Sequence, residues 1–307
     1  MHLKTISTFR PANRIDIKDI QESIGLNTKE YERVTDFHQL RYIMDSGAET
    51  SYDMVRKALQ DLFQKNSINS DNLGGIIYGH AMQSHPDGNG FLEKLKVEFS
   101  LEKVPSFTIS DLNCVTPITA IEIATKLLSN SSKKYVLLLF AEKMYIDSMR
   151  KIEDMTVFSD GAVACLISVE GESNEIISIN QFVDSKVSNI GNWDEQSYRW
   201  FQMSYFLGIK KLLKLTQRKT GIDLRDIKLI VPHNVNYDTW ELASRSLNIP
   251  IEDIYTENIA ELGHVSGCDI FLNLQDALSN GKLKKGSYYL LLSVGLGGAY
   301  GCILMKH

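Results

Sequence analysis

Residues 110–128, SDLNCVTPITAIEIATKLL, indicate how the chain folds around one cysteine. Asp111 and Asn113 end an extended segment, and Pro117 fits the first turn of a helix, where a missing N–H is tolerated. We therefore predict a helix that begins at or just after Cys114. Its body is almost wholly apolar, as is typical of a helix in the centre of a layered fold. The apolar positions are Ile118, Ile121, Ala124, Leu127 and Leu128.

A thiol at a helix N-terminus can act as a nucleophile. Unpaired backbone N–H groups and the positive end of the helix dipole stabilise the thiolate, and can lower the thiol pKa by a unit or more from about 8.5. Cys114 is therefore a candidate to attack a thioester carbonyl. Taken alone, Cys114 would be interpreted as a small buried hydrophobe, as most unpaired cysteines are. We interpret Cys165, Cys268 and Cys302 in that way, because two lie in apolar strand patterns and Cys268 lies in a loop without a helix start of its own.

Short apolar runs alternate with amphipathic stretches along the chain. The runs at 74–80, 135–142, 227–234 and 288–295 predict buried strands. Helical spacing of apolar residues between the runs, at 51–65 and 205–215, predicts helices. This alternation favours a layered α/β fold.

Two pairs of distant segments share a pattern. SDGAVACLISVE (159–170) resembles LGGAYGCILMKH (296–307), and SINSDNLGGIIYGH (67–80) resembles GIDLRDIKLIVPHN (221–234). The repetition predicts two similar halves, 1–172 and 173–307, with their boundary in the polar segment EGESNE. No Gly/Ser-rich or Pro-rich linker lies there, so we expect the halves to pack as one body.

Composition excludes several classes of protein. The 307 residues, of which 43% are hydrophobic, can bury a large core. With 33 basic and 38 acidic residues spread along the chain, no basic face for nucleic acid is indicated. The charged N-terminus lacks the apolar region of a signal peptide, and no apolar run has membrane-spanning length, so we expect a cytoplasmic protein without a membrane partner. The four cysteines show no C-x-x-C spacing, so no metal site is predicted.

Two histidines and a glycine turn complete the candidate site. His233 ends the apolar strand IKLIV, from which a side chain can point into a crevice, and His80 ends a similar strand in the first half. His264 follows a glycine in IAELGHVSGCDIFLNLQDAL. The segment SVGLGGAYGCILM (293–305) contains four glycines, which let the backbone approach a ligand and offer N–H groups to an oxyanion, although a tight hairpin needs the same glycines.

In their order along the chain, these blocks resemble the β-ketoacyl-acyl carrier protein synthase III family. The resemblance covers nearly the whole chain. Its matching blocks are DLNCVTPITAIEIA, FSDGAVACLI, PHNVNYDTW, GHVSGCDIFLNLQDAL and VGLGGAYGCILM. The resemblance implies a thiolase fold, a five-layer αβαβα arrangement of two duplicated halves. It also implies a homodimer, with a tunnel that admits a phosphopantetheine arm.

The resemblance also implies roles for individual residues. Cys114 would be acylated, and His233 would polarise the thioester carbonyl of the second substrate or assist proton transfer. The backbone N–H groups of Cys114 and of Leu296 or Gly297 would form the oxyanion hole, and Asn236 would lie near the pantetheine arm. No tightly bound cofactor is implied; an acyl-coenzyme A or acyl-phosphopantetheine thioester of an acyl carrier protein would be the substrate.

The chain also departs from the family pattern. The third catalytic position is usually asparagine, and here it is His264, which could also take a proton as a general base. The family usually has a Trp and an Arg that clasp the coenzyme A nucleotide, and this chain has no clear match for them beyond Tyr31. Asp238 stands where relatives that dock carrier proteins often have Arg. These departures favour a role in secondary metabolism over housekeeping fatty-acid initiation.

The sequence therefore predicts an acyl-Cys114 intermediate whose acyl group is joined to a malonyl-type thioester with loss of carbon dioxide. One alternative is transfer to an amine or a hydroxyl without decarboxylation, with His264 or His233 as the base. Another is a non-catalytic subunit of a heterodimer with a related chain. A thioester hydrolase is disfavoured, because a buried tunnel would exclude water. Acyl chain length would depend on the tunnel and on the loop 79–94.

Overall fold

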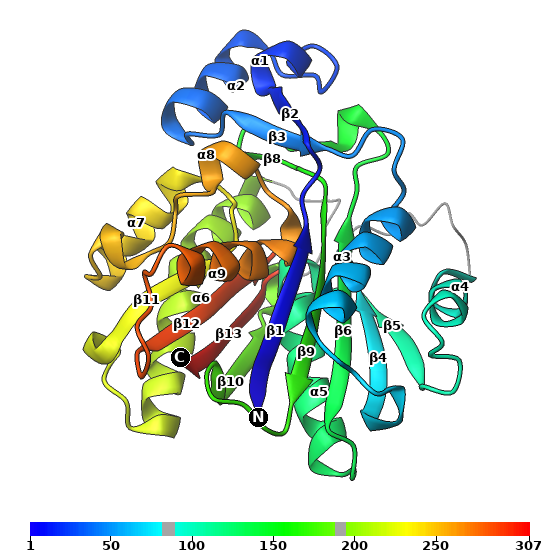
Figure 1. Cartoon of the computed structure of the whole chain (residues 1–307). Helices are drawn as coiled ribbons and strands as arrows, with labels where there is room; N and C mark the ends of the chain where they lie inside the picture. Colours follow the sequence, from blue (N-terminus) through cyan, green and yellow to red (C-terminus); the bar gives the residue numbers. More distant parts are fainter. Residues whose placement is uncertain (82–89, 188–194) are drawn as a thin grey trace.

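The computed structural model describes residues 1–81, 90–187 and 195–307, which fold around a nine-stranded sheet (Figure 1). The strands lie in the order β11-β12-β13-β10-β1-β9-β6-β4-β5. One set comprises β1 (His2–Phe9), β4 (Leu73–Gly79), β5 (Ser106–Ile109), β6 (Tyr135–Glu142) and β9 (Gly161–Ser168). The other comprises β10 (Glu175–Val183), β11 (Ile227–Pro232), β12 (Tyr288–Gly295) and β13 (Ala299–Lys306). The two sets meet where β1 pairs with β10 at His2 and Glu175.

The two sets follow the same path. In each, the first strand in the chain (β1 or β10) pairs antiparallel with the last (β9 or β13). In each, the last strand also runs antiparallel to its other neighbour, β6 or β12. Ile254 forms a parallel bridge to Ile230 of β11, at the place that β5 occupies beside β4. The segments that resemble each other in sequence therefore occupy equivalent strands.

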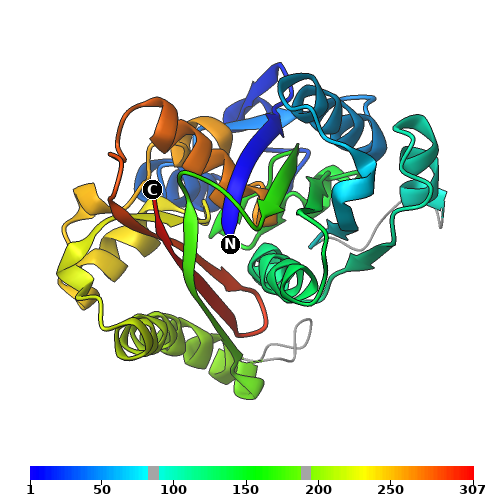
Figure 2. The same cartoon turned by 60° about the horizontal axis from the view of Figure 1, so that its bottom comes forward.

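Helices cover both faces of each set, which gives five layers. α3 (Ser51–Lys65) and α4 (Phe91–Glu98) cover the outer face of the first set, and α6 (Glu195–Thr220) and α7 (Tyr237–Leu247) cover that of the second. Figure 2 shows α3 and α6 on opposite sides of the molecule. α5 (Thr116–Ser129) and α9 (Asp269–Ser279) lie between the sets.

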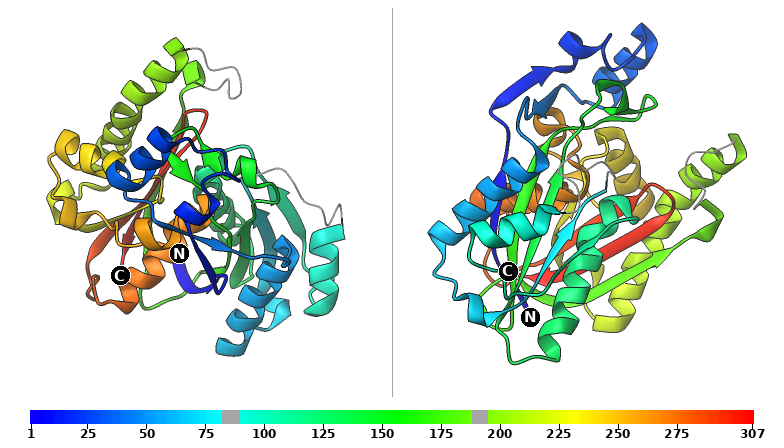
Figure 3. Two further views of the ribbon diagram at one scale, coloured as in Figure 1. Left: turned by 90° about the horizontal axis from the view of Figure 1, so that it is seen from above. Right: turned by 90° about the vertical axis from the view of Figure 1, so that its right-hand side faces the viewer.

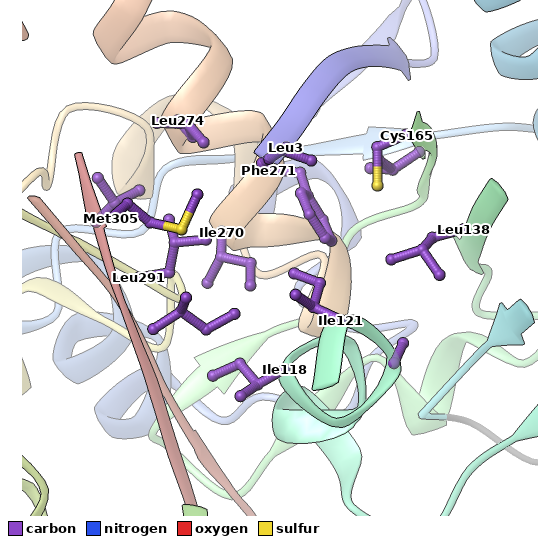
Figure 4. Close-up of a cluster of buried hydrophobic side chains, with 14 of the residues drawn as sticks. Leu3, Ile118, Ile121, Leu138, Cys165, Ile270, Phe271, Leu274, Leu291 and Met305 are labelled. Atoms are coloured by element: carbon purple, nitrogen blue, oxygen red, sulfur yellow. The ribbon is translucent and has the colours of Figure 1, made fainter. Parts of the chain in front are cut away.

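Strands β6, β9 and β12 are apolar over most of their length because both of their faces are buried. In β6, Val136, Leu138 and Phe140 face the central helices, whereas Leu137 and Leu139 face α3. Figure 4 shows the central core, to which α5 contributes Ile118 and Ile121, and α9 contributes Ile270, Phe271 and Leu274. The predicted α/β alternation and the predicted helix at 51–65 are confirmed, and α6 extends beyond the predicted 205–215.

A small cap lies above the sheet (Figure 1; Figure 3, right). It contains the antiparallel pair β2 (Asn13–Asp16) and β3 (Tyr42–Asp45), with α1 (Ile17–Ile20), α2 (Thr28–Glu32) and a π-helical turn at Arg33–Phe37. β7 (Lys151–Ile152), β8 (Thr156–Val157) and α8 (Ile259–Leu262) lie near this end of the molecule. Among the described residues, no helix combines the length and apolar composition that crossing a membrane requires.

Close packing of α6 on β13 predicts the effect of one substitution. A Cβ atom added at Gly208 would lie 2.2 Å from the ring of Tyr300, which is only 1% exposed and stacks on Phe182. Although alanine gains about 1 kcal/mol of helix propensity over glycine, we expect Gly208→Ala to lower the free energy of unfolding by a net ~2 kcal/mol. Urea denaturation measures this, with Leu207→Ala, at an exposed position of the same helix, as the control. Equal stability of the two variants would contradict the packing.

Candidate active site

Cys114 lies where an extended segment turns into the central helix α5. Residues Asn113–Val115 form a 3₁₀ turn, and α5 begins at Thr116 with Pro117 in its first turn, so the predicted helix start is confirmed. Asn113 has a φ of 49°, a left-handed conformation that turns the chain sharply before the cysteine. Cys114 is 7% exposed.

The glycine turn after β12 packs against this cysteine turn. A Cβ atom at Gly295 would lie 2.4 Å from the carbonyl oxygen of Leu112, so only glycine fits there. The Asn113 side chain donates to the Leu296 carbonyl at 2.6 Å, and the Ser293 hydroxyl donates to the Cys114 carbonyl at 2.6 Å. These contacts hold the backbone of Leu296 beside the cysteine turn. An oxyanion hole formed by Cys114 with Leu296 or Gly297 stays a prediction.

His264 contacts the sulfur directly. Its Nε2 lies 3.4 Å from Cys114 Sγ, and the hydroxyl of Ser266 lies 3.5 Å from the same sulfur. The loop that carries His264 is anchored by two backbone hydrogen bonds, to Val157 and from Ser159. The ring also stacks on Phe158, with centroids 5.2 Å apart. The structure therefore brings two of the predicted site residues, Cys114 and His264, into contact.

The other ring nitrogen of His264 faces a buried carboxylate. Nδ1 lies 2.5 Å from Oδ2 of Asp269, which is 0% exposed and also accepts from the backbone N–H groups of Asn234 and Val265, each at 2.7 Å. Burial disfavours the charged ring, but Asp269 and the Cys114 sulfur outweigh burial and raise the pKa of His264 to about 10. His264 is therefore a cation at neutral pH.

His233 directly follows β11, as His80 follows β4, and its surroundings differ from those of His264. Its Nε2 lies 3.2 Å from the hydroxyl of Tyr205, and its ring centroid lies 5.7 Å from that of His264. Burial and the neighbouring His264 hold the pKa of His233 well below its usual range. Burial, with the Cys114 sulfur, holds the pKa of Tyr205 well above its usual range. The site therefore combines one cationic and one neutral histidine.

Cys114, Tyr205, His233, His264 and Ser266 border one cavity of about 710 Å³, whereas Asp269 lies behind His264 and is not part of the cavity wall. Asn236 also borders it, but its amide is used within the protein: it caps α7 by accepting from the Thr239 N–H at 2.7 Å and donates to the Met155 carbonyl at 2.9 Å. Its role near a pantetheine arm stays a prediction. Residues 82–89 of the loop expected to influence acyl chain length lie outside the described residues. In the described part of the chain, no cluster of three or more His, Cys, Asp or Glu side chains is arranged to hold a metal ion.

Sequence reasoning missed Asp269, Tyr205 and Ser266. Asp269 lies five residues after His264 and begins α9, so the spacing of the two could have suggested the pair. Tyr205 comes from the middle of α6, and nothing in the sequence connects it with His233. The expectation that Cys268 lacks a helix start is wrong, because Cys268 immediately precedes α9. It is nevertheless fully buried, and burial raises its pKa well above the usual range.

Comparisons with known proteins identify the family of this chain. Residues 110–185 match the family model "3-Oxoacyl-[acyl-carrier-protein (ACP)] synthase III", and residues 217–307 match the model of its C-terminal part. The β-ketoacyl-[acyl-carrier-protein] synthase III of Aquifex aeolicus is 24% identical, with all of both chains covered. Two solved structures share the fold. ChlB3, described as an acyltransferase, has a TM-score of 0.87 at 18% identity and covers 99% of this chain and 97% of its own. Xanthomonas campestris OleA has a TM-score of 0.83 at 13% identity and covers 100% and 98%.

These matches extend over the whole chain and confirm the predicted thiolase fold. The two family models include both the cysteine turn of α5 and the histidine loop before α9. The chain belongs to the β-ketoacyl-acyl carrier protein synthase III family of the thiolase superfamily and is a condensing enzyme of the acyltransferase class.

Proposed function

We propose that Cys114 accepts an acyl group from a coenzyme A or carrier-protein thioester and that the acyl group is then joined to a malonyl-type thioester with loss of carbon dioxide. The observation that carries this proposal is the position of His264 between the Cys114 sulfur and the Asp269 carboxylate. A cationic imidazole beside the sulfur favours negative charge on the sulfur. It also provides a strong hydrogen-bond donor inside the cavity.

In the first half-reaction, the Cys114 thiolate attacks the donor thioester. The bond from Sγ to the acyl carbon forms, the bond from that carbon to the donor sulfur breaks, and the donor leaves as a thiol after taking up a proton. The backbone N–H groups of Cys114 and of Leu296 or Gly297 would stabilise the negative oxygen of the tetrahedral intermediate. The contacts of the glycine turn with the cysteine turn support this placement.

In the second half-reaction, the malonyl thioester loses carbon dioxide to give an enolate. Its carbon attacks the acyl carbon, and Sγ leaves as a thiolate. No base is needed, because carbon dioxide departs in place of a proton. What the step needs is positive charge near the enolate oxygen, and the cationic His264 meets that need. A group that is already protonated cannot act as the base, which argues against His264 in that role.

Transfer to an amine or a hydroxyl is the second candidate function. The neutral His233 favours it, because a neutral imidazole can accept a proton from such an acceptor. In the tautomer with its proton on Nδ1, Nε2 accepts from Tyr205, and an acceptor hydroxyl could replace Tyr205 there. The two candidates therefore differ in the histidine that they use.

Discharge of the acyl-protein distinguishes the two functions. We expect a malonyl thioester to release the acyl group from Cys114, with one carbon dioxide and one β-ketoacyl product per discharge. The matched control is the acetyl thioester, which lacks the carboxylate and should not discharge the acyl-protein. Discharge by amines or alcohols, with no effect of the malonyl thioester, would replace condensation by the second candidate.

The biological setting is also a proposal. We propose a role in secondary metabolism, supported by His264 and Asp238 at positions where the family usually has Asn and often has Arg. We further propose a cytoplasmic homodimer, with halves 1–172 and 173–307 and with a heterodimer as the alternative. Contact of Cys114 with His264 argues against a non-catalytic subunit.

A further inference from the structure

Two groups that can be negatively charged face the His264 ring on opposite sides. Asp269 lies against Nδ1, and the Cys114 sulfur lies against Nε2. Among the described residues, the other titratable neighbour of the ring is His233, which is neutral, with the protonated Tyr205 behind it. The remaining face of the ring stacks on Phe158. When Cys114 carries an acyl group, its sulfur is a neutral thioester, so Asp269 becomes the one anion among these neighbours.

We propose that Asp269 is a positioning residue that keeps His264 protonated after Cys114 has been acylated. The inference rests on the proposed function, because it concerns the acyl-enzyme. Asp269 does not contact the Cys114 sulfur, and it influences the reaction only through its hydrogen bond with His264.

The role of Asp269 matters because His264 can lose a proton during acylation and must be protonated again before condensation. The donor thiolate takes up one proton as it leaves, and His264 Nε2 is 3.4 Å from the sulfur at which the exchange takes place. If His264 supplies that proton, its ring must regain one from solvent before the enolate forms. The ring then has no thiolate beside it to favour the charged form. The Asp269 carboxylate supplies that stabilisation, and Nε2–H can donate to the enolate oxygen.

Asp269 is itself held in place by several hydrogen bonds. Its two oxygens accept from the backbone N–H groups of Asn234 and Val265. The Asn234 side chain accepts from Asn273, one turn along α9, at 2.7 Å, and Asn273 also donates to the carbonyl of Pro232 at 2.7 Å. Asn234, Asn273 and Asp269 are all 0% exposed. These hydrogen bonds therefore hold the carboxylate against Nδ1 of His264.

The test is to measure the rate of acylation and the rate of discharge of the acyl-protein separately in the Asp269→Asn variant. We expect discharge of the acyl-protein by a malonyl thioester to slow about 100-fold, and acylation to slow less than about 10-fold, because the thiolate still favours the cationic ring during acylation. In the pH profile of the discharge rate, the fall on the alkaline side should also move to lower pH, toward the ordinary histidine pKa of about 6.5. The matched control is Asp276→Asn. Asp276 lies on the same helix, but its carboxylate bonds Arg10 and not His264.

A merely structural role for Asp269 gives a different result. Equal slowing of both half-reactions with an unmoved pH profile would overturn the inference, and so would an unchanged discharge rate. If Asp269→Asn does not fold, the same pH profile is measured for Asp269→Glu, which keeps the charge and should keep the alkaline limb of the native protein. In a His264→Asn background, Asp269→Asn should have no further effect on discharge; an additive effect would count against action through His264. Failure of the native protein to form any acyl adduct would instead remove the proposed function, and this inference with it.

Discussion

Replacing Cys114 with alanine abolishes turnover, with an expected fall of at least about 10⁴-fold in the rate of product formation. The reason is that, in the proposed mechanism, Sγ of Cys114 is the atom that bonds the acyl group, and no other described thiol is placed to replace it. Cys165, Cys268 and Cys302 are 0% exposed, whereas Cys114 borders the cavity. Product formation from an acyl thioester and a malonyl thioester measures the effect.

A second cysteine provides the control. Cys302→Ala removes a buried sulfur that bonds Thr216 and lies outside the cavity, so this variant should keep the native rate. Full activity of Cys114→Ala would show that the acyl group never resides on this residue. Equal losses in both variants would show that the effect comes from packing.

Replacing His264 with asparagine should lower the free energy of unfolding by about 3–5 kcal/mol. The substitution removes the cation that pairs with Asp269 and leaves a buried carboxylate with only two backbone donors among the contacts described above. The double variant His264→Asn, Asp269→Asn should recover a large part of the loss, because neither charge remains. Denaturant unfolding of the native protein and the three variants gives the coupling free energy directly. Additive losses would show that the two side chains do not interact.

The pH dependence of this stability has a definite sign. The pKa of His264 is raised to about 10, above its ordinary value of about 6.5. A raised pKa contributes stability that is complete below about pH 6.5 and is lost as the pH rises through about 10. The stability difference between the native protein and the double variant should therefore shrink between these values. A difference that stays constant over this range would contradict the charge assigned to His264.

Local signals in the sequence predict a layered α/β fold with two similar halves, whereas the thiolase fold itself was implied by the resemblance to the family. Pro117 and the apolar body that follows Cys114 specify a central helix. The paired segments 67–80 and 221–234 specify equivalent strands, each followed by a histidine. Such patterns depend on periodicity along the chain, which the sequence displays directly.

The charges of the site could not be predicted in this way. The sequence left His264 open as a general base, whereas its contact with Asp269 makes it a cation. The neutral state of His233 depends on burial and on His264, which no spacing reveals. Tyr205 reaches the site from α6 through packing alone. Interactions between distant segments thus decide which residue can accept a proton.

The most direct test of an acyl-Cys114 intermediate is the intact mass of the protein after incubation with a panel of acyl-coenzyme A and acyl-carrier thioesters. We predict one covalent adduct with the mass of the acyl group, formed by the native protein and by Cys302→Ala but not by Cys114→Ala, and released by a malonyl thioester. An adduct that persists in Cys114→Ala, or no adduct from any donor, would contradict the account.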